Sequence, residues 1–286
     1  MRNIFLLLII IILASCQKEI DMDYHEVEPL LAIEGRVTNE GVYVLITRTR
    51  SMDDPDKGRG IDGATVTVSS DDAEERLVYD ATDGRYHSPS GMKGVAGRAY
   101  RLKVTLDGRD YEAASVMPQQ AAIVSTQFVW QPVLDNGVLM YEMWATDAEP
   151  DVRNYFLYRM ERRATDPKVR QKQGSDAYRR NTFDDRGSMD GRIYRDIMCL
   201  NEEMMDGRDI EDDQLKQVVF DGDTIMLELM AIDRPTFEYY QSLSIGQRMG
   251  SNPKTNISGG CLGYFTAGNI SRADTVVYYQ DSIIRR

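Results

Sequence analysis

The sequence predicts a mainly β protein. An antiparallel β-sandwich over residues 30–117 is followed by a second β-rich domain over residues 118–286 with one or two short helices. Three observations lead to this prediction. Short apolar or alternating segments recur at close spacing, Asp-Gly turns separate several of them, and Pro118 interrupts the pattern between two regions of different regularity.

The N-terminus has the features of a bacterial lipoprotein signal. Arg2 supplies the positive charge, and Ile4 to Leu13 is an unbroken apolar run. A run of about ten residues is too short to span a membrane as a helix, which needs roughly 20, but it fits the apolar region of a signal peptide.

Residues 13–16, Leu-Ala-Ser-Cys, look like a lipobox. Small residues at 14 and 15 suit the signal peptidase, and the Cys16 thiol can accept the lipid. We therefore expect residues 1–15 to be a signal peptide, Cys16 to be the lipid anchor and residues 16–29 to be a lipidated tether. Two or three acyl chains such as palmitate would hold the protein stably to a membrane. The alternative is a plain secretory signal with an incidental cysteine.

The tether itself carries information about location. Lys18 is followed by Glu19, Asp21 and Asp23, which resembles the export tether of Bacteroidetes surface lipoproteins. We expect a lipid anchor in the outer membrane with the protein on the cell-surface face. An ordinary acidic linker on the periplasmic face is the alternative.

The amino-acid composition argues against some classes of binding partner. The formal net charge of −12 argues against nucleic acid and against docking onto anionic headgroups. The chain after residue 15, about 270 residues, is long enough to bury a sizeable core. It contains no second apolar run of transmembrane length.

Residues 30–117 read as short strands joined by turns. Ala64 to Val68 alternates strictly, as a half-buried strand does, and Asp83-Gly84 and Asp107-Gly108 are hairpin signals. The expected strands are 31–37, 42–49, 64–68, 76–80, 85–87, 100–106 and 110–116, with a polar loop at 51–60. About seven such strands indicate an antiparallel sandwich.

The second domain stays β-rich but is less regular. Residues 163–195 are charged and poor in aliphatic side chains, so we expect a long exposed loop with at most one short helix. Asp233 can cap a helix that has Pro235 in its first turn and runs to about Met249. The expected strands are 126–133, 138–146, 154–162, 224–232, 257–268 and 275–279.

Cysteines are sparse. With Cys16 lipidated, Cys199 and Cys261 remain; an exported compartment would allow a disulfide between them, and two free buried thiols are the alternative. Neither His25 nor His87 lies near a cysteine, so no zinc pattern is present.

A search for catalytic patterns finds little. There is no Gly-x-Ser-x-Gly elbow and no glycine-rich phosphate loop. Residues 206–213 alternate acidic side chains and could hold calcium, but Arg208 intrudes and an acidic turn is the simpler interpretation. We expect a non-enzyme that needs no cofactor or metal, with a two-carboxylate glycan hydrolase as the least favoured alternative.

Aromatic side chains of the second domain are the remaining candidates for ligand recognition, because sugars and other rings bind to such faces. Core packing is the alternative, since most of them fall at strand or helix spacing. They are Trp130, Trp144, Tyr155, Tyr158, Tyr239, Tyr240, Tyr264 and Phe265.

Several segments in order resemble the DUF4249 lipoproteins of Bacteroidetes. The lipobox with Gln-Lys-Glu-Ile-Asp is followed by Leu-Ala-Ile-Glu-Gly-Arg-Val-Thr-Asn at 31–39 and Gly-Ala-Thr-Val-Thr-Val at 63–68. Further segments are 94–102, the hairpin ending at Met117-Pro118, Glu-Tyr-Tyr at 238–240, Asn252-Pro253, and 256–265. The resemblance implies an immunoglobulin- or transthyretin-like N-terminal sandwich and a second β-rich domain. It places Cys261 where a small residue is expected.

The resemblance also suggests a TonB-dependent outer-membrane receptor as partner. The leading functional hypothesis is a non-catalytic surface lipoprotein that helps such a receptor capture or import a nutrient. A cell-surface adhesin or structural module is the alternative. The sequence identifies neither the ligand nor the oligomeric state.

Overall fold

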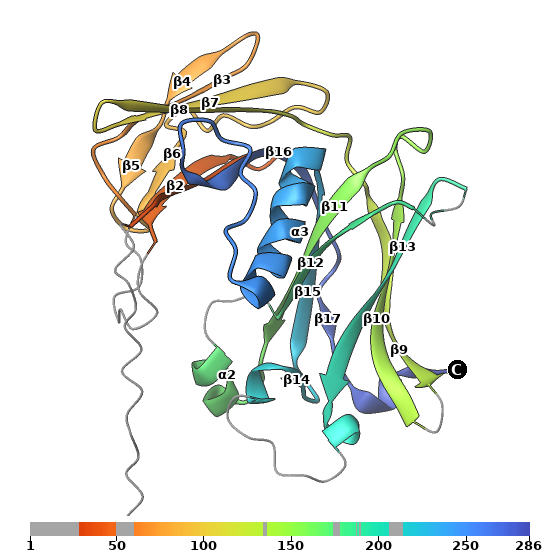
Figure 1. Ribbon diagram of the computed structural model, residues 1–286. Coiled ribbons are helices and arrows are strands. Elements are labelled where there is room, and N and C mark those ends of the chain that lie inside the picture. The colour runs from red at the N-terminus through yellow and green to blue at the C-terminus, as the bar shows by residue number, and fades with distance from the viewer. Residues whose placement is uncertain are drawn as a thin grey trace, which may run out of the picture.

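The computed structural model describes residues 29–49, 60–133, 136–173, 178–186, 188, 190–205 and 214–286. The signal peptide, the lipobox and nearly all of the tether lie outside these residues, as does the acidic segment 206–213. The described chain is mainly β, with two α-helices and short 3-10 turns (Figure 1).

The first half of the chain forms eight strands. They are β1 (Leu31–Thr38), β2 (Val42–Arg48), β3 (Thr65–Ser69), β4 (Glu74–Arg76), β5 (Val78–Asp80), β6 (Arg85–His87), β7 (Ala99–Leu106) and β8 (Arg109–Val116). These confirm the expected strands to within a few residues. One exception is the 76–80 segment, which is divided between β4 and β5 with buried Leu77 between them.

The second half begins at β9. Its strands are β9 (Ile123–Val133), β10 (Asn136–Thr146), β11 (Tyr155–Arg163), β12 (Arg179–Asp184), β13 (Arg192–Asn201), β14 (Val218–Val219), β15 (Thr224–Ile232), β16 (Leu262–Arg272), β17 (Val276–Val277) and β18 (Ile284–Arg285). Its helices are α2 (Pro167–Gln173) and α3 (Arg234–Met249), with 3-10 turns at Glu202–Met205, Gln214–Lys216 and Gln280–Ser282.

One long sheet runs through the molecule in the order β12-β11-β15-β16-β1-β2-β6-β5, with β17 paired to β15. Two smaller sheets, β4-β3-β7-β8 and β14-β13-β10-β9-β18, pack on it (Figure 1). The first hydrophobic core lies under the four-stranded sheet and the second under the five-stranded sheet. Two sandwiches therefore share a single sheet.

Strand parity shows that both small sheets cover the same face of the shared sheet. Phe265 and Ala267 of β16 belong to the first core, while Leu229 and Ala231 of β15, which pair with Ser271 and Asn269, belong to the second. Residues on a strand alternate between faces, so these side chains all point the same way. Helix α3 covers the opposite face, over Met230 and Ile270.

The predicted boundary at 117/118 marks where the chain first leaves the N-terminal sandwich. The structure does not divide there into two separate units, because β16 returns and pairs in parallel with β1 from Ala32–Leu262 to Thr38–Gly268. Ile257, Cys261 and Phe265 complete the first core. The N-terminal sandwich is thus built from residues 31–117 together with 257–268.

The expectation of a long loop over 163–195 was wrong, although the one short helix expected there is present as α2. This region contains α2, all of β12 and the first residues of β13. Strand β12 is an edge strand whose exposed positions carry Arg180 and Asn181, while Phe183 faces the core. Charged residues are common on edge strands, and they concealed the alternation in the sequence.

Helix α3 confirms its expected limits. The Asp233 carboxylate accepts a hydrogen bond from the backbone N–H of Thr236 at 3.0 Å, and Gly250 ends the helix with φ +68°. The same carboxylate accepts a bond from Ser115 Oγ of β8 at 2.6 Å, and Ser115 Oγ accepts from Ala267 N of β16 at 2.8 Å. The cap therefore joins the helix to β8 of the first sandwich and, through Ser115, to β16 of the shared sheet. Among the described residues, no helix has the length and apolarity required to cross a membrane.

A glycine substitution tests the parallel pairing of β1 with β16. Gly263 has φ +104°, and a Cβ there would lie 1.9 Å from the Ile33 carbonyl oxygen. Strain and overlap should make Gly263→Ala lower the free energy of unfolding by about 3 kcal/mol, measured by urea titration.

The matched control is Gly41→Ala in the turn between β1 and β2, where nothing lies within 4 Å of the added Cβ. It should change the stability by less than about 1 kcal/mol. Equal stability of the two variants would contradict the described pairing.

Candidate functional site

The strongest candidate site lies on the outer face of the five-stranded sheet. In β10, Tyr141, Met143 and Ala145 point into the second core, as their alternation predicts. The intervening Glu142 and Trp144 point the other way and pair in register with Asp196 and Tyr194 of β13. On the other side of β10 they pair with Gln127 and Ser125 of β9. We call these six residues the Trp144 face.

Glu142 is the polar centre of this face, with a side chain that is fully buried. Its carboxylate accepts bonds from Gln127 Nε2 at 2.8 Å and Gln131 Nε2 at 3.2 Å. Arg286 forms a bidentate ion pair with the same carboxylate: its Nη1 donates to Oε1 at 2.8 Å and its Nη2 donates to Oε2 at 3.0 Å. A buried carboxylate with this many donors is stably ionised.

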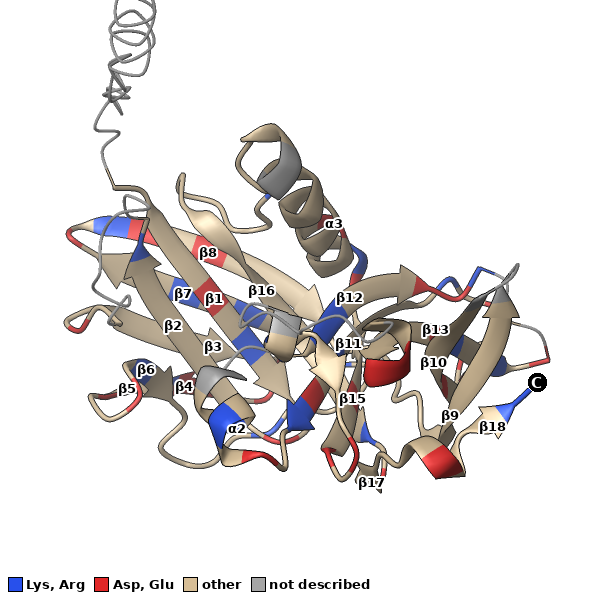
Figure 2. Cartoon of the chain, turned by 90° about the horizontal axis from the view of Figure 1, so that it is seen from below, with Lys and Arg blue, Asp and Glu red and all other residues tan. Residues whose placement is uncertain are grey.

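Arg286 reaches Glu142 because β18 adds to the edge of the sheet. Ile284 and Arg285 pair in parallel with Val129 and Trp130 of β9, which brings the basic end of β18 beside that strand (Figure 2). Arg285 lies over the Trp130 ring at 5.3 Å and forms an ion pair with Glu203 at 2.8 Å. Two arginines therefore hold this edge of the sheet.

Tyr194 connects the carboxylates to the aromatic part of the face. Its hydroxyl lies 3.1 Å from Glu142 Oε1 and also contacts Asp196 Oδ1. Burial and then the carboxylates of Asp196 and Glu142 raise the pKa of Tyr194, so the phenol stays protonated. A hydroxyl has one proton, so it donates to one carboxylate at a time and leaves acceptor capacity on the other.

The aromatic part of the face is open to solvent. The rings of Trp144 and Tyr194 lie 4.4 Å apart between centroids at 43°, and the two residues are 38% and 37% exposed. Large side chains that are paired and exposed beside hydrogen-bonding groups are typical of recognition surfaces.

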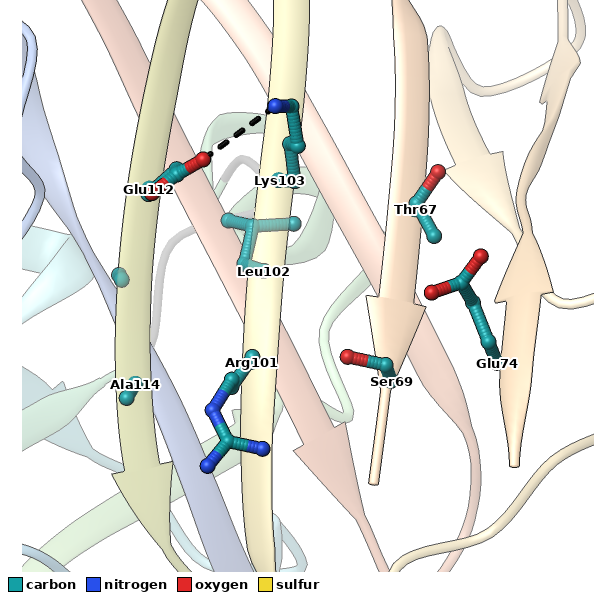
Figure 3. A pocket seen from close by; sticks show the side chains of 9 residues that line it. Thr67, Ser69, Glu74, Arg101, Leu102, Lys103, Glu112 and Ala114 are labelled. Atoms are coloured by element: carbon teal, nitrogen blue, oxygen red, sulfur yellow. Dashed lines mark ion pairs between the residues drawn. The ribbon is translucent and has the colours of Figure 1, made fainter. Parts of the chain in front are cut away.

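Another candidate is a hollow of about 450 Å³ on the outer face of the four-stranded sheet (Figure 3). The charge of Lys103 in this hollow is already neutralised, because its Nζ lies 2.8 Å from Asp110 and 3.3 Å from Glu112. In Figure 3 the side chains stand side by side along the strands and do not converge on a common point. This hollow is an ordinary solvated sheet face.

A buried cluster around Arg36 has a structural role. Arg36 Nε donates to the Tyr264 hydroxyl at 2.8 Å, and its Nη2 donates to the Tyr240 hydroxyl at 3.1 Å. The Tyr239 and Tyr264 rings lie 4.7 Å apart. Since these residues come from β1, β16 and α3, the cluster fixes the helix to the shared sheet.

The comparisons with known proteins bear on the family. The model of the family described as "Domain of unknown function (DUF4249)" matches residues 17–274, most of the chain. The chain belongs to the DUF4249 family. No curated protein matches it.

The DUF4249 match confirms the resemblance inferred from the sequence but assigns no site. The match begins at residue 17, and the predicted anchor Cys16 lies outside the described residues. Within the described parts of the chain, no three His, Cys, Asp or Glu side chains gather as metal ligands would. The suggested calcium segment 206–213 is not among those parts.

The two remaining cysteines of this DUF4249 protein are free and buried, so the disulfide alternative does not hold in the structure. Cys199 lies in the second core and Cys261 in the first, on opposite sides of the junction between the sandwiches. Burial raises the pKa of Cys199 to about 12 and that of Cys261 to about 11, which keeps both as unreactive thiols.

Most of the predicted aromatic residues pack in the interior, as the core-packing alternative holds. Tyr158, Tyr239, Tyr264 and Phe265 are buried, and Trp130, Tyr155 and Tyr240 are half-buried. Trp144 is the exposed member of the set. Tyr194 was missed because it lies in the segment interpreted as a loop, although the apolar residues Ile193, Ile197 and Cys199 give a strand signal there.

The pH dependence of stability tests the Glu142 network. Burial alone would raise the pKa of Glu142, but the bonds from Gln127 and Tyr194 and the charge of Arg286 hold it below its ordinary value of 4.5. A lowered folded-state pKa stabilises the protein above the unfolded-state pKa, and this contribution is lost as the pH falls through the folded-state pKa. At pH 7, Glu142→Gln should reduce the free energy of unfolding by about 2 kcal/mol.

The difference between parent and Glu142→Gln should narrow below about pH 4.5, measured by urea unfolding at a series of pH values. Glu112→Gln removes a solvent-exposed carboxylate and serves as the control, with little change at any pH. A gap that is constant with pH would contradict the ionised network.

Proposed function

We propose that this chain is a non-catalytic lipoprotein, anchored by Cys16 on the cell-surface side of the outer membrane. There it binds a ligand for a TonB-dependent receptor that imports it. The observation that carries the proposal is the lipobox at residues 13–16, placed directly after a ten-residue apolar run and before an acidic tether. The match to the DUF4249 family begins at residue 17, directly after the proposed anchor.

The Trp144 face supports the ligand-binding part of the proposal. It joins exposed aromatic rings to a fixed hydrogen-bonding network on a rigid sheet. A preorganised surface of this kind loses little conformational freedom when it binds. The first sandwich and α3 leave this outer face uncovered, because they pack on other parts of the shared sheet.

Lipid attachment is tested by fractionation and acyl labelling in the native host. Cys16→Ala should abolish incorporation of an alkyne-tagged palmitate and release the protein from the membrane fraction, since the anchor is covalent. Cys261→Ala is the matched control, because it removes a buried thiol and leaves the lipobox intact. Membrane retention and labelling of Cys16→Ala would contradict the anchor.

The receptor partnership is tested by immunoprecipitation from outer membranes in mild detergent, with antibody against the folded protein. A tag at the C-terminus would disturb Arg286 and is avoided. We expect a TonB-dependent receptor to co-purify, and antibody added to intact cells to label the lipoprotein. Recovery of the lipoprotein alone would contradict the accessory role and favour an adhesin, whereas labelling only after lysis would contradict surface exposure.

A further inference from the structure

The Trp144 face meets a hollow of about 500 Å³ beside the indole ring. Val124, Ser125, Ala145, Thr146 and Arg192 complete its lining. This volume lies in the range of about 300–1,000 Å³ that is typical of small-molecule sites. One wall is therefore a flat apolar ring, Val124 and Ala145 add further apolar surface, and Ser125, Thr146 and Arg192 contribute hydroxyl and guanidinium groups.

The register of β10 and β13 places complementary groups in a row along this surface. Thr146 pairs with Arg192, Trp144 with Tyr194, and Glu142 with Asp196. Cross-strand partners lie on the same face about 5 Å apart. A ligand lying on the rings would thus have hydrogen-bonding groups at both of its ends.

Charge selects among the ligands that could bind to aromatic rings. Glu142 is neutralised by its bidentate ion pair with Arg286, and the row itself carries one further charge of each sign, Asp196 at one end and Arg192 at the other. An anionic ligand would meet the carboxylates, and a cationic ligand would meet Arg192 in the hollow. Local neutrality therefore favours an uncharged ligand.

The hydrogen-bonding groups narrow the class further. The single proton of the Tyr194 hydroxyl lies between two carboxylates, so a carboxylate oxygen retains acceptor capacity for a hydroxyl donor. Asp196 is only half-buried and can be reached from outside. The ligand should therefore present several hydroxyl groups around the edge of an apolar ring face.

From this geometry we infer that the Trp144 face binds a pyranose ring of a neutral oligosaccharide. The C–H face of one sugar ring lies on Trp144, and hydroxyl groups of the oligosaccharide bond to Asp196 at one end of the row and to Ser125 and Arg192 at the other. The inference rests on the proposed function and specifies the substrate class that it leaves open.

Tryptophan fluorescence can report this binding directly. The chain has two tryptophans, so Trp130→Phe leaves Trp144 as the reporter. The lipoprotein is purified in mild detergent and screened on an array of neutral and charged glycans, and retained neutral glycans are then titrated. We expect a saturable change in Trp144 emission with at least one neutral oligosaccharide, and none with choline or with oligogalacturonate.

Single substitutions distinguish an effect on ligand binding from an effect on folding. Trp144→Ala lacks the reporting indole, so its affinity is measured by isothermal titration calorimetry alongside that of the parent; it should be weaker roughly tenfold or more, because the stacking wall is gone. Tyr194→Phe keeps the ring and tests the hydroxyl, and Tyr279→Ala, an exposed aromatic outside this face, should bind normally. Circular dichroism spectra like that of the parent and a cooperative melting transition establish that the variants are folded.

Three results would overturn the inference. They are no retention of any neutral glycan by the folded parent protein, binding that survives Trp144→Ala, or selective retention of charged glycans. The receptor co-purification is repeated on the same variants. Receptor capture without glycan binding overturns the sugar assignment alone, and glycan binding without receptor capture overturns only the accessory role.

Discussion

Strand β16 is the constraint on which the rest of the structure depends. It pairs in parallel with β1 on one side and antiparallel with β15 on the other, and residues 263–270 are buried on both faces. Without it the shared sheet would separate into two pieces, and the first core would lose Phe265 and Ala267. Because β1 and β16 lie far apart in the chain, their pairing closes a very long loop and must follow synthesis of the C-terminal half.

This arrangement explains why the Trp144 face is free. The shared sheet uses one face to hold both small sheets and the other to hold α3, fixed by the Arg36 cluster and by the Asp233 cap. The five-stranded sheet is therefore buried on one side only. Its outer side is open to solvent, so it can carry aromatic rings next to polar side chains. Burying the same polar side chains without hydrogen-bond partners would cost free energy.

Local signals in the sequence predicted most of the individual elements. Alternation located the strands up to β11, and Asp233 with Pro235 located the start of α3. Alternation also separated Glu142 and Trp144 from Tyr141 and Met143 on the two faces of β10, and the structure shows that the second pair lies on the buried face. These features depend on neighbouring residues in the chain, so one sequence is enough to find them.

Long-range features were not predictable in the same way. The boundary at 117/118 reflected local turn chemistry around Pro118, whereas the β1–β16 pairing depends on partners more than 200 residues apart. Arginines in β12 and β13 obscured the alternation of apolar residues in the sequence. For this reason neither strand was predicted, and Tyr194 of β13 was not recognised as a candidate site residue. The contacts of Glu142 with Arg286 likewise become visible only once β18 is placed beside β9.

Because β16 belongs to the sheet that both sandwiches share, we infer that the two sandwiches form one cooperative unit, which holds the Trp144 face rigidly in place. Native-state hydrogen exchange of the mature lipoprotein, followed by mass spectrometry at increasing urea, tests it most directly. We expect the amides of β1, β7, β10, β15 and β16 to open with the same free energy and the same urea dependence. A single cooperative unit would be contradicted if the amides of β1 and β7 opened in a separate step from those of β10 and β15.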